Sequence, residues 1–474
     1  MLNYHLLLTC GGDRKLRIEK DTLGNVRLPD SAYYGAQTKR AVLNFPISGL
    51  RLPRRFIRAQ GIVKLAAVRA NGSLGLLKRK IWKAVEKAAL EVISGRHDRH
   101  FVVDVYQAGA GTSQNMNANE VIANRALEIL GRKKGDYSFI HPNDHVNMAQ
   151  STNDTIPTSM YISCREAVTE DLMPALQGLH DALSAKAEEF DGIVKAGRTH
   201  LQDAVPVRLG QEFSGFAEAV KNDMARLQKA LDSLLYLPLG GNALGTGINA
   251  HPRFRGRVIR EIREITGIRF RSCKNLFEGI QNVYPALELS ASLRGISITL
   301  TKIANDIRLL SSGPRTGFAE IRLPAVQPGS SIMPGKVNPV MAEMLNMVCF
   351  QVMGNDTAVA CAVQASQLEL NVMMPLIAHN LLFSIEILSN GVNAFTEKCV
   401  SGISADTKRC REYAEATLAM ATALNPVIGY SSAAGVARDA YRTGKTVRQV
   451  AVEKGILSER DAGRILDPRR LTGK

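Results

Sequence analysis

The chain has 474 residues, of which 45% are hydrophobic and 22% charged, and its net charge is +16 at pH 7. This composition is typical of a globular protein of about three domains and excludes collagen-like, disordered and disulfide-rich secreted proteins. No apolar run reaches the length of about 18 residues that a membrane span needs. The basic residues are spread along the chain, which favours solvated faces and a small anionic substrate over nucleic-acid or membrane binding.

The cysteines and the first residues predict that the protein is cytoplasmic. Seven cysteines are scattered without a Cys-x-x-Cys pair, a pattern typical of reduced thiols in a cytoplasmic protein. Residues 1–10 are mildly apolar but lack a basic start and a cleavage site. They therefore predict no signal peptide.

Taken in chain order, the elements predict a mainly all-α protein in three parts. Residues 1–150 read as a mixed, mostly helical domain, with short extended pieces at 16–19 and 25–28. Residues 151–400 contain apolar seams in alternating steps of three and four, which predict long helices packed as an elongated bundle. Residues 401–474 read as a small domain of short helices. The long helices are expected over 209–234, 289–310, 340–363 and 376–398.

Helix-capping residues support the prediction that residues 401–474 form a small domain of short helices. Thr446 with Gln449, and Ser458 with Asp461, have the spacing of capping boxes at helix starts. Gly455 is suited to end the first of these helices.

A Gly- and Ser-rich connector between long helices offers the strongest candidate site. Residues 329–339 read Gly-Ser-Ser-Ile-Met-Pro-Gly-Lys-Val-Asn-Pro. Asn338 is expected to cap a helix whose first residue is Pro339. A helix N-terminus, Lys336 and a row of backbone amides together suit a carboxylate or phosphate.

Three further connectors are small and polar. They are residues 109–113, followed by Asn115 and Asn117; residues 150–154, ahead of a helix expected to start near Pro157; and residues 197–203, expected to be a polar turn between two helices. Together the connectors offer neutral donors, one lysine and one histidine, and no metal-ligand set such as His-Glu-x-x-His. This inventory predicts proton chemistry on a small dianion without a metal or cofactor. Residues 240–245 suggest a dinucleotide loop, but no strand precedes them.

The 329–339 motif resembles the signature of the aspartase/fumarase superfamily. The other three connectors resemble that superfamily's active-site segments in the same order, and the likeness runs from about Arg17 to the C-terminus. The resemblance implies a three-domain, mainly helical fold whose long central bundle assembles into a homotetramer. It also implies a lyase that eliminates across the Cα–Cβ bond of a succinyl compound and releases fumarate.

Within the superfamily, the motifs are most similar to the aspartase branch. Ala110, Thr152 and residues 367–373 resemble aspartases, whereas Ser366 and Met374 depart from them and residues 239–247 are similar to fumarases. We therefore expect reversible deamination of L-aspartate to fumarate and ammonia. The alternative is the fumarase reaction, which converts L-malate to fumarate and water.

The resemblance also implies a role for each candidate residue. Ser330, as an alkoxide, would be the base beside Lys336, and His200 would bind and orient the substrate, with Glu343 fixing its tautomer. The remaining residues would bind the substrate, each lost donor to the developing charge slowing the reaction by about 10²–10³. These are Thr112, Ser151, Thr152 and Ser331 at the β-carboxylate, Lys336, Asn338 and Thr199 at the α-carboxylate, and Asn153 near the amino group.

The same likeness implies that the site is shared between subunits. One subunit would supply Thr112 and residues 151–153, a second residues 199–200, and a third residues 329–338. A helix of about 25 residues spans nearly 40 Å, so connectors separated by such helices do not easily meet within one subunit. A nucleic-acid-binding or scaffold protein on an inactive lyase fold would have lost Ser330, Lys336 or His200, and all three are present.

Overall fold

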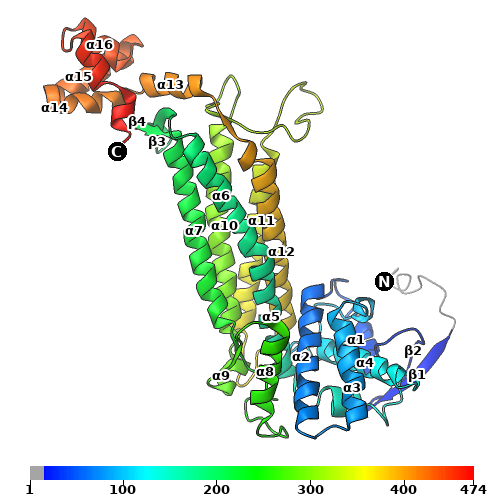
Figure 1. Cartoon of the computed structure of the whole chain (residues 1–474). Helices are drawn as coiled ribbons and strands as arrows, with labels where there is room; N and C mark the ends of the chain where they lie inside the picture. The colour runs from blue at the N-terminus through cyan, green and yellow to red at the C-terminus, as the bar shows by residue number, and fades with distance from the viewer. Residues whose placement is uncertain (1–14, 474) are drawn as a thin grey trace. The chain divides into compact units, whose positions relative to one another are not determined.

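A computed structural model describes residues 15–473 as two compact units (Figure 1). The first unit comprises residues 15–171, Leu227–Arg294 and Val352–Glu386, and the second comprises Leu172–Arg226, Gly295–Gln351 and the chain from Ile387. The sequence-based prediction for residues 1–10 lies outside the described residues. None of the helices within residues 15–473 is long and apolar enough to cross a membrane.

The first unit is built around helix α2 (Arg54–Ser73), which packs against α3, α5 and α8. Its core is formed by small and branched side chains such as Val85, Ala88, Val121 and Ile122, all fully buried. Its other elements are β1 (Leu16–Asp21), β2 (Gly24–Pro29), α1 (Ala36–Asn44), α3 (Arg79–Ile93), η1 (Asp98–His100), α4 (Thr112–Ile129), η2 (Pro142–Val146), α5 (Thr152–Ala167), β5 (Tyr236–Leu237), α8 (Phe254–Thr266), β6 (Arg271–Ser272) and α9 (Leu276–Gln281).

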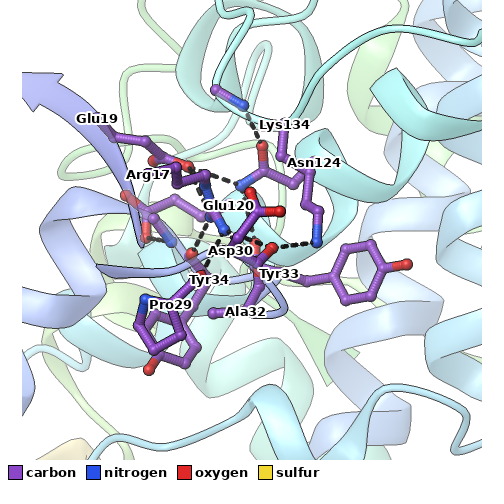
Figure 2. Close-up of polar contacts among 12 residues, drawn as sticks. Arg17, Glu19, Pro29, Asp30, Ala32, Tyr33, Tyr34, Glu120, Asn124 and Lys134 are labelled. Carbon is purple, nitrogen blue, oxygen red and sulfur yellow. Dashed lines mark hydrogen bonds and ion pairs between the residues drawn. The ribbon is translucent and has the colours of Figure 1, made fainter. Parts of the chain in front are cut away.

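The β1–β2 hairpin confirms the two predicted extended pieces and is fastened by Arg17. The Arg17 guanidinium donates to the carbonyls of Pro29 (2.8 Å), Ala32 (2.7 Å) and Tyr34 (2.9 Å), as Figure 2 shows. Each of its contacts replaces one that the cation would make with water. The hairpin and the following loop are thereby fixed to one another.

The N-terminus of helix α1 is bound by a buried carboxylate of α4. Glu120 accepts the backbone N–H groups of Gly35 (2.8 Å), Gln37 (3.0 Å) and Thr38 (3.1 Å). A carboxylate is favourable there because the first N–H groups of a helix have no partner inside the helix. Burial nevertheless raises the pKa of Glu120 to about 7. Helix α4 therefore supports α1 from its middle, while its own N-terminus carries Thr112.

The four predicted long helices are confirmed. The seam residues Leu289, Leu293, Leu300 and Ile307 of α10 are each at most 1% exposed, as an interhelical seam requires. The four helices run side by side in Figure 1, and contacts within each unit, such as Ser290 to Asp356 (2.7 Å) and Asn346 to Asn305 (2.8 Å), join α10 to α11. They are α7 (Leu209–Ser233), α10 (Tyr284–Leu310), α11 (Val340–Gln364) and α12 (Met374–Lys398).

The second unit adds a hairpin and the short C-terminal helices. The predicted capping box of Thr446 and Gln449 is confirmed at α16, and Ser458 caps α17 by accepting the Asp461 N–H at 3.0 Å. The short helices of residues 418–471 enclose their own small core. The unit's elements are η3 (Val168–Leu172, which begins in the first unit), α6 (Met173–Glu189), β3 (Val194–Thr199), β4 (Gln202–Arg208), β7 (Ile321–Arg322), η4 (Val400–Gly402), β8 (Ser404–Ala405), α13 (Thr407–Ala416), η5 (Leu418–Leu424), α14 (Asn425–Ile428), α15 (Tyr430–Thr443), α16 (Val447–Glu453), α17 (Glu459–Ile465) and η6 (Pro468–Leu471).

Candidate active site

In the first unit, Thr112 is the first residue of α4. The turn before it is possible because Gly111 has a φ of +84°, a conformation that side chains beyond glycine rarely adopt. Gln107 then caps the helix from outside, since its Oε1 accepts the Gln114 N–H at 2.8 Å. Thr112 itself is exposed at the positive end of the helix dipole, where an anion would be favoured.

The start of α5 differs from the sequence-based prediction. The helix begins at Thr152, not near Pro157, which lies inside it. The reason is a capping box: the Ser151 hydroxyl caps the first turn, and Asp154 Oδ1 accepts the Ser151 N–H at 2.9 Å. Thr152 and Asn153 therefore lie in the first helical turn.

The glycine-rich segment 240–245 supports this helix start. Asp154 Oδ2 accepts the N–H groups of Gly240 (3.0 Å) and Asn242 (2.8 Å), and Asn153 donates to the Ala243 carbonyl at 2.7 Å. Asp154 is fully buried, and burial raises its pKa to about 7. The segment thus has a structural role. The premise that no strand precedes it was wrong, because the two-residue strand β5 lies just before it and pairs in parallel with β6.

The α4 and α5 N-termini lie together, and residues 371–374 pack beside them. Asn115 Nδ2 donates to Thr152 Oγ1 at 3.1 Å, which joins the two helix starts. Gly109 accepts the Met374 N–H at 3.0 Å, and a Cβ added to Gly109 would overlap the Val372 carbonyl oxygen. The structure therefore brings three of the predicted segments into one place in the first unit.

In the second unit, His200 does not lie in a simple turn between helices. Residues 194–208 form the hairpin β3–β4, with Thr199 paired to Gln202 and His200–Leu201 as its two-residue loop. Both loop residues have positive φ values, 56° and 59°, as such hairpin turns require. Asn-Gly is the usual pair in this turn, so His-Leu gave no turn signal. A side chain held at positive φ on an exposed tip is a strained feature.

The base of this hairpin is anchored by buried charges. Lys195 donates to Glu212 at 2.7 Å, and Arg198 contacts the fully buried Glu320 at 3.0 Å. These ion pairs fix the strands, while Thr199 and His200 remain exposed beyond them.

The 329–339 connector folds back on itself as a closed loop. Gly329 donates to the Lys336 carbonyl at 2.9 Å and accepts from the Asn338 side chain at 2.6 Å. Asn338 therefore closes the loop instead of capping a helix at Pro339, and α11 begins at Val340. Inside the loop, Ser330 Oγ accepts the N–H groups of Met333 (2.9 Å) and Ile332 (3.2 Å).

The other predicted residues of this region are accessible. Ser331 and Lys336 are exposed, and Glu343 lies in the first turn of α11. Within residues 15–473, no ion pair joins Glu343 to His200. In that same described range, no group of three or more His, Cys, Asp or Glu side chains could hold a metal ion.

Sequence reasoning missed a buried lysine below the α4 and α5 N-termini. Lys64 is 1% exposed and donates to Asn115 (2.8 Å), Asn147 (2.8 Å) and Gln150 (3.1 Å). The available signal was a lysine within the apolar run 61–67 of a helix. Its partners are contributed by separate stretches of sequence, so no local pattern could identify them.

Comparisons with known proteins agree with this arrangement. Residues 24–354 match the Lyase family and residues 420–473 match the fumarase C C-terminus. The chain is 47% identical to an aspartate ammonia-lyase of Bacillus subtilis over 97% of each chain. It is 51% identical to a class II fumarate hydratase of Halobacterium salinarum over 96% of this chain and 97% of that protein. The solved fumarate lyase:delta crystallin from Brucella melitensis is 48% identical with a TM-score of 0.95, over 97% of this chain and 100% of that one. The chain belongs to the aspartase/fumarase superfamily of lyases.

Proposed function

We propose that this chain is an aspartate ammonia-lyase, which converts L-aspartate reversibly to fumarate and ammonia by anti elimination with a serine base. Relatives with either activity match it about equally well, so the choice rests on the site. The observation that carries it is the packing of residues 371–374 against Gly109 beside Thr152. The aspartase-like residues Ala110, Thr152 and 367–373 belong to these adjoining segments.

The reaction begins with loss of a proton from Cβ. The electron pair of the broken C–H bond moves into the neighbouring carboxylate and produces a doubly charged aci-carboxylate. The pair then returns to form the Cα–Cβ double bond, while the C–N bond breaks and the ammonium group leaves as ammonia. Because Cβ is only weakly acidic, donors aimed at the developing carboxylate charge provide most of the acceleration.

Thr112, Ser151, Thr152 and Ser331 are the proposed donors to that carboxylate. The first three support this role by their position at two helix N-termini, where unpaired N–H groups and the helix dipole favour an anion. The α-carboxylate would be bound by Lys336 with Thr199 and Asn338. In this structure Asn338 donates to its own loop, so it would bind the substrate after a change in the loop.

Ser330 is the proposed base. A serine hydroxyl is a poor base unless its alkoxide is selectively stabilised. The two N–H groups that Ser330 Oγ accepts, from Ile332 and Met333, would stabilise that anion more strongly than the neutral hydroxyl. Lys336, on the same loop, would add a positive charge when the loop closes over a substrate.

His200 and Asn153 would orient the amino group of the substrate. His200 is held at positive φ on the hairpin tip, so the hairpin presents its ring outward. A Glu343 carboxylate from another subunit would fix the tautomer of that ring.

We also propose a homotetramer in which three subunits contribute to each site. Support comes from the exposed face of α11, where Met347 and Phe350 are 66% and 56% exposed in the middle of a long helix. Large apolar side chains in such a position are typical of a subunit interface.

The activity is tested by fumarate formation from L-aspartate and from L-malate with the purified protein and no added nucleotide or redox cofactor. Absorbance of the fumarate double bond reports both reactions. We expect faster turnover of L-aspartate. Faster turnover of L-malate would assign the chain to the alternative, class II fumarate hydratase.

A further inference from the structure

A buried lysine with no acidic hydrogen-bond partner among the described residues is linked through the Asn115 side chain to Thr152, one of the proposed carboxylate donors. Lys64, on α2, is 1% exposed, and among residues 15–473 the hydrogen-bond partners of its ammonium are amide oxygens and not carboxylates. Burying an ammonium is unfavourable unless its N–H groups are all satisfied. Burial lowers the pKa of Lys64 to about 7, and the negative charge of Asp154 opposes this shift.

The partners of Lys64 are three side-chain amides. Its Nζ donates to Asn115 Oδ1 (2.8 Å), Asn147 Oδ1 (2.8 Å) and Gln150 Oε1 (3.1 Å). An ammonium carries three N–H groups and accepts nothing. The number of acceptor oxygens therefore equals the number of donors, and the arrangement suits the charged form.

This geometry decides which way each amide faces. A side-chain amide can donate from one end and accept at the other, and its orientation is set by its neighbours. Because Lys64 can only donate, the oxygen of each amide must face it and the nitrogen must face away. The nitrogen of Asn147 donates to the Gln150 carbonyl at 3.2 Å, and that of Gln150 donates to the Val146 carbonyl at 3.0 Å.

For Asn115, the nitrogen faces Thr152. Asn115 Nδ2 donates to Thr152 Oγ1 at 3.1 Å and, more weakly, to Asn147 Oδ1 at 3.3 Å, an oxygen that Lys64 also holds. The Thr152 hydroxyl therefore acts as an acceptor toward the protein and keeps its own proton for another partner. If Asn115 were turned round, its oxygen would face Thr152, and the hydroxyl would donate that proton to Asn115. The orientation of one amide thus controls whether Thr152 can donate to a substrate.

We propose that Lys64 is a positioning residue of the lyase reaction: acting through Asn115, it holds the Thr152 hydroxyl as a donor toward the substrate carboxylate. The proposal rests on the proposed function through the role of Thr152. Lys64 itself does not touch the substrate. It acts by excluding the alternative orientation of Asn115, and the chain of hydrogen bonds polarises the Thr152 hydroxyl in the same direction.

A double-mutant cycle separates this role from a general effect on folding. Lys64→Met keeps a long unbranched side chain but lets Asn115 turn, so we expect kcat to fall about tenfold or more with KM changed less than about threefold. In Thr152→Val there is no hydroxyl to orient, and adding Lys64→Met should lower kcat by less than about twofold further. Equal losses in the two backgrounds, or an unchanged kcat in Lys64→Met, would overturn the proposal.

A second variant covers the case in which Lys64→Met fails to fold. Asn115→Asp keeps the shape of the side chain and gives Lys64 a charged partner. Its second carboxylate oxygen now faces Thr152 and accepts a hydrogen bond from that hydroxyl. We expect a stable protein with kcat reduced about as much as in Thr152→Val. Retention of wild-type kcat by a folded Asn115→Asp would contradict the proposal.

Lys186→Met is the control for loss of a buried lysine elsewhere, because Lys186 lies in the second unit and donates to the Ile403 carbonyl and to Glu189. It should lower thermal stability without lowering kcat at saturating substrate. The cycle is run with whichever of L-aspartate or L-malate the wild type turns over faster. Additive losses then overturn the Lys64 proposal alone, whereas faster turnover of L-malate overturns only the ammonia-lyase assignment.

Discussion

The two units hold their candidate residues in different ways. In the first, Thr112 and Thr152 stand on helix N-termini that are supported from below by buried polar side chains, among them Lys64, Asn115 and Asp154. In the second, Ser330 lies on a loop closed by its own hydrogen bonds, and His200 lies on an exposed hairpin tip whose base is anchored by the Arg198–Glu320 ion pair. The first group is therefore held by contacts from several separate segments of the chain, whereas Ser330 is held by hydrogen bonds within its own loop.

Ser330→Ala should have the largest effect on turnover, because it removes the proposed base. We expect kcat to fall by at least about 10²-fold, as for loss of a general base. The thermal unfolding midpoint should not change, since Ser330 lies half-buried on a loop. Steady-state rates with L-aspartate test this. A variant that keeps more than about a tenth of the wild-type kcat, a barrier change below about 1.4 kcal/mol, would exclude Ser330 as the base.

Lys336→Met should weaken binding of succinate-like inhibitors, because one carboxylate of the ligand loses its charged partner. The expected loss is about 2–5 kcal/mol for a desolvated pair left unpaired. Inhibition constants for succinate, measured at constant ionic strength, report the change. If the variant binds succinate as tightly as the wild type, Lys336 is not part of the site.

Alanine substitutions at two glycines test whether the first unit's candidate region is more rigid than the 329–339 loop. A Cβ on Gly109 would overlap the Val372 carbonyl, so Gly109→Ala must displace the 371–374 segment. Gly335, on the loop, has open space but a φ of +80°, and alanine there would cost only about 1–2 kcal/mol of backbone strain. We expect a clearly lower thermal midpoint for Gly109→Ala and a smaller change for Gly335→Ala. The reverse order would show that the first region is not the more rigid.

The smallest expected effect concerns the pH dependence of stability. Burial raises the pKa of Glu120 from 4.5 to about 7, so the folded chain keeps a proton that the unfolded chain loses between these values. Its stabilising contribution is complete below about pH 4.5 and is lost as the pH rises through about 7, at no more than about 1.4 kcal/mol per pH unit. Glu120→Gln should show a flatter pH dependence of its unfolding midpoint between pH 5 and 8. Parallel curves for the two proteins would contradict this assignment.

The sequence predicted the long-range architecture better than the local geometry of the site. The seam of Leu289, Leu293 and Leu300 fixed α10 because a helical period repeats over many residues. The hairpin at His200 was missed because its turn lacks Asn or Gly. The start of α5 was misplaced because the prediction put Pro157 at the first helical position. The capping box of Ser151 and Asp154 starts the helix earlier, and Pro157 lies inside it.

The roles of individual residues could be approached only through the family resemblance. Side-chain contacts such as Lys64 to Asn115 depend on packing between segments that are distant in sequence, and no local pattern records them. The same limit applies to Asn338, whose predicted capping role is replaced by a hydrogen bond across the loop to Gly329. The division into three domains at residues 150 and 400 stays a prediction.

The central claim is that the residues of one site come from different subunits. Ser330→Ala and Thr199→Val, each inactive alone, are unfolded together, refolded and assayed, with refolded wild type as the control. If subunits assort at random in a tetramer, about a quarter of the sites will contain both native residues. We expect activity to return to about a quarter of the wild-type value. A mixture that stays as inactive as each parent, while refolded wild type recovers, would contradict the shared site.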